Sequence, residues 1–90
     1  MKSWGSVVEI ETRRRILLSV YAAAYEIHND SLISDEKFDK MSLEVDLTIK
    51  TKNKKMDKWF KENFDSSTGM WVRKHPEIKK LEIIYNSLKY

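Results

Sequence analysis

The feature that most constrains this chain is its shortage of residues that turn a backbone. Gly5, Gly69 and Pro76 are the only glycines and proline in 90 residues. A fold of many short strands needs a turn roughly every 8–12 residues, and such turns draw on Gly and Pro. A helical fold needs far fewer chain reversals. The sequence therefore predicts an all-α, single-domain bundle of about four helices, with a short extended segment near 45–49 or 70–73 left open.

Size and composition narrow the class of protein further. Ninety residues bury one core, and 41% hydrophobic residues are too many for a disordered chain. The chain has no cysteine, which excludes disulfides, thiolate metal sites and cysteine nucleophiles. Charged residues interrupt the first twenty positions, so neither a signal-peptide core nor a membrane span is expected there. We expect a soluble, cytoplasmic protein.

Charge divides the chain into two parts. Residues 1–49 hold 6 Lys and Arg against 9 Asp and Glu, whereas residues 50–90 hold 11 against 5. Within one domain spanning 1–90, we expect a flexible lead at 1–6, a helical hairpin at 7–45 and a basic helical half at 50–90. Such a division affects the choice of partner rather than the fold.

The first half is expected to form two helices. Helical spacing over 7–28 predicts one helix, with its buried face formed by Ile10, Leu17, Tyr21, Ala24 and either Ile27 or His28. Ser34 is a favoured N-cap residue and is expected to start a second helix, whose apolar stripe contains Phe38 and Met41. Residues 45–49 also alternate with period two, so that a helix and an extended segment both remain open there.

The second half is expected to form two more helices. Asn53 is a suitable N-cap for a helix over 54–64, and residues 65–69 form the clearest loop in the chain. Pro76 is expected to open the last helix, because the first turn tolerates proline. Its apolar stripe contains Ile78, Leu81, Ile84, Tyr85 and Leu88.

One segment carries a recognisable pattern. Tyr25 comes late in the first helix, Ile33-Ser34-Asp35 follows a turn, and Phe38-Asp39 falls in the next helix. This arrangement resembles the N-terminal Ia domain of NAD-dependent DNA ligases, over residues 13–45. In that family the Ia domain is a small helical module that closes over the nicotinamide mononucleotide half of NAD. The resemblance implies that Tyr25 stacks near the nicotinamide ring, beside Phe38, while Asp35 and Asp39 hydrogen-bond the ribose and the amide.

The chain departs from the family at two positions of this pattern. Glu26 stands where the family has a histidine, and Phe38 stands where it has a second tyrosine. The Lys-x-Asp-Gly motif that carries nucleotidyl transfer is absent. The chain by itself is therefore not expected to be a ligase. The same residues also suit an ordinary helix start and an ordinary interhelical contact.

Two further groups of residues are candidates for binding. Lysines interleaved with aromatic residues suit nucleic acid, and a solvated helix face would have the same pattern; they are Lys52, Lys54, Lys55, Lys58 and Lys61. Large aromatic residues anchor protein interfaces or a homodimer, and they also fill small cores; the candidates are Trp59, Trp71 and Tyr85.

No catalytic or metal-binding set is expected. His28 and His75 lack a second ligand at helical spacing, and two glycines cannot make a phosphate loop. We therefore expect a non-enzymatic binding or regulatory module that acts through a protein partner and needs no cofactor. By analogy with other small proteins of this size, we expect a phage or mobile-element inhibitor of a host nucleic-acid-processing or defence complex. Binding of nicotinamide mononucleotide or NAD is the first alternative, and nucleic-acid binding through Lys50–Lys61 is the second.

Overall fold

A computed structural model of the chain describes residues 6–89, which form four α-helices and one short 3-10 helix. The elements are α1 (Val7–His28), α2 (Asp35–Glu44), α3 (Lys54–Asn63), the 3-10 helix η1 (Met70–Lys74) and α4 (Ile78–Lys89). No strand occurs among the described residues. The all-α prediction is confirmed. The expected lead at 1–6 lies outside the described residues except for Ser6.

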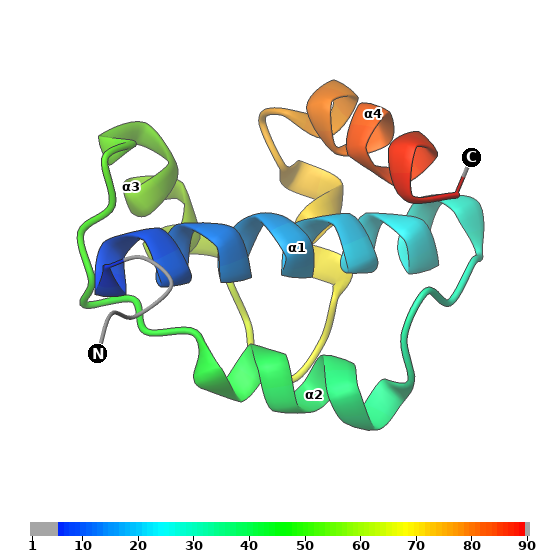
Figure 1. Ribbon diagram of the computed structural model, residues 1–90, viewed down its shortest axis with the longest axis horizontal. Coiled ribbons are helices and arrows are strands. Elements are labelled where there is room, and N and C mark those ends of the chain that lie inside the picture. Colours follow the sequence, from blue (N-terminus) through cyan, green and yellow to red (C-terminus); the bar gives the residue numbers. More distant parts are fainter. Residues whose placement is uncertain (1–5, 90) are drawn as a thin grey trace.

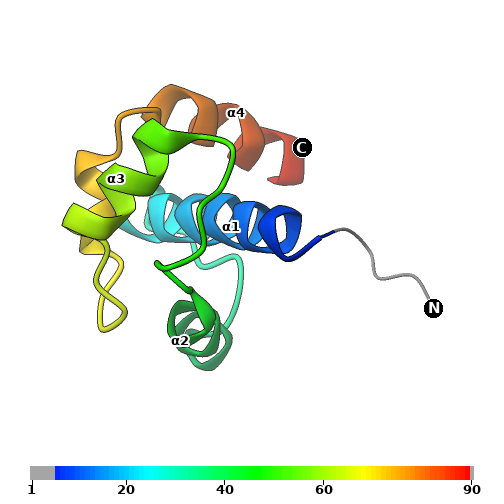
Figure 2. The same ribbon diagram turned by 90° about the vertical axis from the view of Figure 1, so that its left-hand side faces the viewer.

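Helix α1 is the central element, and the others pack around it. Helix α2 lies along one side, whereas α3, η1 and α4 lie on the other (Figures 1 and 2). Ser6 and Glu9 form a capping box at the start of α1, in which each side chain accepts a hydrogen bond from the other residue's backbone N–H. Asn29 ends the helix in the left-handed region at φ 51°, and the chain then reverses towards α2.

The buried face of α1 differs in part from the expected one. Ala24 is buried as expected and Leu17 and Tyr21 are half-buried, but Ile10, Ile27 and His28 are exposed. Leu18, Val20, Ala22 and Ala23 are buried as well. Burial extends around the helix because α2, η1 and α4 contact it from several directions. A single amphipathic stripe does not describe a helix at the centre of a bundle.

The next two helices begin where the caps predict. The Ser34 hydroxyl accepts from the Lys37 N–H, and the Asn53 side chain accepts from the Met56 N–H. Helix α2 ends at Glu44, and Val45 is extended before a short turn. Residues 45–49 therefore neither continue the helix nor pair as a strand. Residues 70–74 are also not extended, because they form η1.

The last helix begins later than expected. Pro76 lies in a turn, and α4 starts two residues after it, at Ile78. Leu81 and Tyr85 face the core as predicted, whereas Leu88 is exposed. The core joins α1, α3, η1 and α4 through a cluster that includes Leu18, Phe60, Trp71, Val72 and Leu81.

A buried polar network holds the segment between α2 and α3 against α1. Arg15 contacts Glu11 at 2.8 Å and Asp57 at 2.9 Å. Its guanidinium also donates to the backbone carbonyls of Asp46 and Ile49. Arg15 is thus buried together with polar partners. The irregular segment between α2 and α3 requires them, because its backbone groups need hydrogen bonds.

Candidate functional site

The residues of the ligase-like pattern converge on one pocket of about 300 Å³ between the end of α1, the start of α2 and the loop before η1. We call it the Tyr25 pocket. It is lined by Tyr21, Ala22, Tyr25, Glu26, Ser31, Leu32, Ile33, Asp35, Phe38, Asp39, Thr68 and Gly69. All four residues singled out from the sequence, Tyr25, Asp35, Phe38 and Asp39, lie in this lining.

Local structure explains the convergence. Asn29 turns the chain at the end of α1, and Ser34 caps α2 so that Asp35 falls in its first turn. Asp39 follows one helical turn after Asp35 and shares its face. Tyr25 approaches from the last turns of α1. A short connection therefore brings two carboxylates and an aromatic ring to one opening.

The pocket has accessible polar groups and an apolar side. Tyr25 is 57% exposed, and Asp35 and Asp39 are also exposed. Phe38 is half-buried, and its ring lies close to Gly69 and Ala22: a Cβ added at Gly69 would be 3.3 Å from Phe38 Cζ. The absence of a side chain at Gly69 thus keeps the loop tight against Phe38.

A charge pair lies at the edge of the pocket. The Arg73 Nε donates to Glu26 Oε1 at 2.9 Å, and the Arg73 side chain is largely exposed. Glu26 occupies the position where the resembled family has histidine. Because Arg73 balances the charge of Glu26, Asp35 and Asp39 are the lining carboxylates that remain to attract a cation. Sequence reasoning did not identify Arg73, which is 47 positions from Glu26.

This combination of groups suits a flat, positively charged ring. An aromatic face attracts a cation, and neighbouring carboxylates add Coulomb attraction and accept hydrogen bonds. Tyr21 and Tyr25 supply rings, and Asp35 and Asp39 supply carboxylates. The lining contains no histidine or lysine. The pocket therefore offers aromatic rings and carboxylates that can recognise such a ring.

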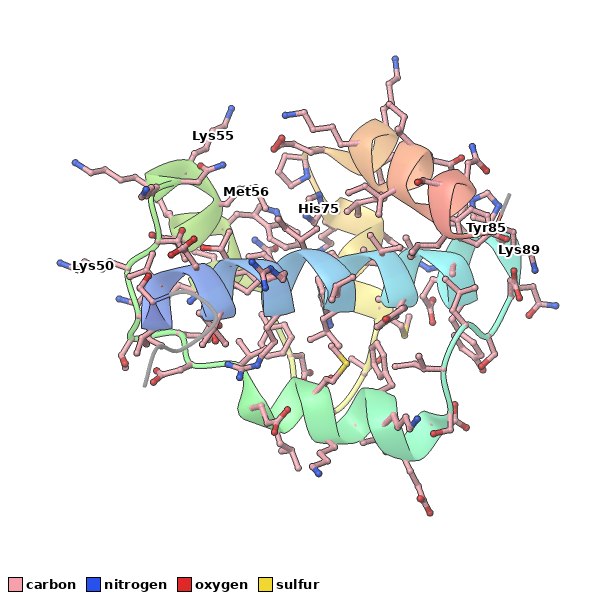
Figure 3. The ribbon with its side chains drawn as sticks, viewed as in Figure 1. Lys50, Lys55, Met56, His75, Tyr85 and Lys89 are labelled. Carbon is pink, nitrogen blue, oxygen red and sulfur yellow. The ribbon has the colours of Figure 1, made fainter. Side chains whose placement is uncertain are left out.

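A second cavity lies on the other side of α1. We call it the α3–α4 groove. It measures about 250 Å³ and is lined by Thr12, Arg15, Ile16, Ser19, Thr51, Asn53, Met56, Asp57, Phe60, His75, Glu77, Lys80, Leu81 and Ile84. Met56 and His75 lie in the space between α3 and α4 (Figure 3). Sequence reasoning missed this groove because its walls come from three separate helices.

His75 is half-buried in the groove beside aromatic rings. Its ring centroid lies 5.0 Å from that of Trp59, and its Nδ1 accepts the Glu77 N–H at 3.0 Å. Burial lowers the pKa of His75 below its usual value. Since Nδ1 accepts, the proton of the neutral ring lies on Nε2. The groove therefore contains one imidazole donor.

The lysines proposed for nucleic-acid binding are exposed, as a binding face requires. Lys52, Lys54, Lys55, Lys58 and Lys61 all lie at the surface around α3. Of the aromatic residues of α3, Phe60 is buried, and Trp59 is half-buried and packs against Phe60 and Trp71. Within residues 6–89, these rings offer at most a partly exposed surface on which a base could stack.

The aromatic interface prediction is corrected for two of its three residues. Trp71 is 5% exposed and Tyr85 is 7% exposed, so both belong to the core. Trp71, in η1, packs against the ring of Phe64 at the end of α3. The Tyr85 ring stacks on His28, and its hydroxyl donates to Asp30. Trp59 is half-buried. A bundle of this size uses its large residues to fill its core.

Comparisons with protein-family models, curated proteins and solved structures found no match to this chain. Across residues 6–89, no three His, Asp or Glu side chains gather as a metal site. None of the helices in that range combines the length and hydropathy needed to cross a bilayer. The candidate sites therefore stand on their own geometry.

Proposed function

We propose that this protein is a small, non-enzymatic binding module whose ligand carries a cationic aromatic ring, and that the ring of nicotinamide mononucleotide fits the Tyr25 pocket. The observation that carries the proposal is the convergence of Tyr25, Asp35, Phe38 and Asp39 on one cavity of about 300 Å³. Ligand pockets start at about this volume. The pyridinium ring lies against Tyr25, and Asp35 and Asp39 accept hydrogen bonds from the ribose and the amide.

Two other functions expected from the sequence have less support in the geometry. Protein binding through exposed aromatic anchors has less support because Trp71 and Tyr85 are buried in the core. Nucleic-acid binding through the lysines has only buried or half-buried rings of α3 beside them. The Tyr25 pocket, by contrast, has its aromatic and acidic groups at an opening.

The proposal is tested by an amide-shift NMR titration of the labelled protein with nicotinamide mononucleotide. We expect saturable shifts confined to the turn of residues 25–39 and to Thr68 and Gly69. The reduced form of nicotinamide mononucleotide is the matched control ligand, because its ring carries no positive charge. It is expected to bind at least about tenfold more weakly, since the ring no longer attracts Tyr25 and the carboxylates.

Charge-removing variants locate the site. Asp35→Asn and Asp39→Asn keep the side-chain shape and are each expected to weaken binding by about tenfold, or about 1.4 kcal/mol. Glu36→Gln removes the same charge from the first turn of α2 but does not line the pocket, so it should leave binding unchanged. Equal affinity for the oxidised and reduced nucleotides, or equal effects of Asp35→Asn and Glu36→Gln, would refute the proposal.

A further inference from the structure

The α3–α4 groove opens onto an apolar line along α1. Val8, Thr12 and Ile16 lie at four-residue spacing and share one face of the helix. Thr12 and Ile16 line the groove and also the open surface beyond it, where Val8 joins them. Ile16 is 44% exposed. From Val8 to Ile16 this line runs about 12 Å, the length of about two helical turns.

The walls of the groove are adaptable and mostly apolar. Met56 on α3 and Ile84 on α4 are both partly exposed, and they belong to the lining on either side of Ile16. Methionine is a common residue at surfaces that accept varied apolar side chains. A cavity of about 250 Å³ is below the size of most small-molecule pockets and suits an inserted side chain.

The charge around the groove is predominantly positive. Arg13, Lys52 and Lys54 line its open end. The pKa of Glu77 is lowered mainly by its hydrogen bond and charge pairing with Lys80, and Lys55 on α3 adds a smaller lowering. The acidic residues of the two linings also have partners: Asp57 pairs with Arg15, Glu77 with Lys80, and Glu9 accepts the Ser6 N–H and lies near Lys52 and Arg13. The open end still holds three cations against the single carboxylate of Glu9, so it attracts carboxylates of a partner.

We propose that the α3–α4 groove binds an acidic amphipathic helix of a protein partner, which lies along α1 and inserts a large apolar side chain between Met56 and Ile84. Carboxylates that flank the inserted side chain pair with Lys52, Lys54 and Lys55. One of them accepts a hydrogen bond from His75 Nε2. This is the helix-in-groove mode of recognition, in which apolar anchors at i, i+3 or i+4 and i+7 provide the contact area.

This interaction is independent of the Tyr25 pocket. The two linings share no residue. The observations favour protein over nucleic acid because the exposed surface of the groove is mostly apolar and the rings of α3 are buried or half-buried. Failure of either proposal therefore leaves the other intact.

The probe is a synthetic amphipathic helix of about four turns, with leucines on one face and glutamates on the others. Its matched control has every glutamate replaced by lysine. In an amide-shift NMR titration, we expect the acidic peptide to shift Thr12, Ile16, Met56 and His75 saturably, with an affinity that falls as salt is raised. The basic peptide should cause no shifts there.

Two pairs of variants test the groove itself. Lys52→Glu/Lys54→Glu reverses charges at the groove and should weaken the acidic peptide at least tenfold, whereas Lys58→Glu/Lys61→Glu makes the same change on surface outside the lining and should not. Ile16→Gln should weaken binding about tenfold, and Ile10→Gln, at a similarly exposed position of α1 outside the groove, should leave it unchanged. Circular dichroism confirms that each variant is folded.

Four results would overturn the proposal. The first is equal binding of the acidic and basic peptides, and the second is no shift of groove residues at millimolar acidic peptide. The third is a shift of groove residues in the free protein that grows with protein concentration, which would make a second copy the occupant. The fourth is binding of a single-stranded oligonucleotide that is weakened equally by the Lys52→Glu/Lys54→Glu and Lys58→Glu/Lys61→Glu variants. That last outcome would assign the lysines to nucleic acid.

Discussion

At the scale of single residues, Arg15 joins α1 to the segment between α2 and α3. Its side chain is 5% exposed and bonds to Glu11, Asp57 and two backbone carbonyls. Replacing it with methionine keeps the apolar stem, but the buried Glu11 carboxylate then has only Arg14 and the Asp46 N–H as partners. We expect Arg15→Met to lower the free energy of unfolding by about 3 kcal/mol in urea denaturation, because Glu11 loses one of its two arginines and two backbone carbonyls lose their donor.

Arg13, two positions before Arg15, supplies the control. Arg13 is exposed, so Arg13→Met should change the unfolding free energy by less than about 0.5 kcal/mol. In a double-mutant cycle, Glu11→Met with Arg15→Met should cost less than the sum of the two single changes, because each single change already removes the Glu11–Arg15 interaction. Similar losses for Arg13→Met and Arg15→Met would contradict this role.

At the scale of elements, the caps decide where helices begin and thereby where site residues point. Ser34 accepts the Lys37 N–H at 3.2 Å at the start of α2, which presents Asp35 and Asp39 to the Tyr25 pocket. Ser34→Ala removes this acceptor and is expected to destabilise the protein by about 1 kcal/mol, measured as a shift of the urea midpoint.

A second substitution at the same position separates the cap from other effects. Ser34→Asp retains an acceptor and places a negative charge at the positive end of the helix dipole. It should therefore be as stable as the natural protein. If Ser34→Asp were as unstable as Ser34→Ala, the hydrogen bond would not be the cause.

At the scale of the whole molecule, stability depends on pH through His75. Burial lowers its pKa in the folded state below the ordinary 6.5. The unfolded chain then binds the proton more readily, so unfolding is favoured as pH falls through about 6.5 towards the folded-state pKa. We expect the urea midpoint to decrease between about pH 7 and pH 5. His75→Asn, which does not titrate and can still accept the Glu77 N–H, should lose most of this decrease.

The carboxylates act in a lower range. Hydrogen bonds and cationic neighbours lower the pKa of Asp30, Asp46, Asp65 and Glu77. Their contribution is present above their ordinary pKa values of 3.8 for Asp and 4.5 for Glu, and it is lost as pH falls further. A decrease between pH 7 and pH 5 that is unchanged in His75→Asn would point to another group.

The sequence by itself determined the features that depend on neighbours along the chain. The bounds of α1, the caps at Ser34 and Asn53, and the loop at 65–69 follow from residue types and spacing. The Tyr25 pocket was predictable in its main residues because Tyr25, Asp35 and Asp39 lie on two helices joined by a short turn. Chain connectivity alone brings such residues together.

The tertiary structure decided the features that depend on contacts between distant segments. It buried Glu11, Arg15 and Trp71, and it exposed Ile10 and Ile27. It also paired Arg73 with Glu26 and assembled the α3–α4 groove from three helices. Local periodicity reports which residues share a face of one helix. Which face is covered depends on how the helices pack around α1, and that arrangement is set by the summed contacts of the whole core.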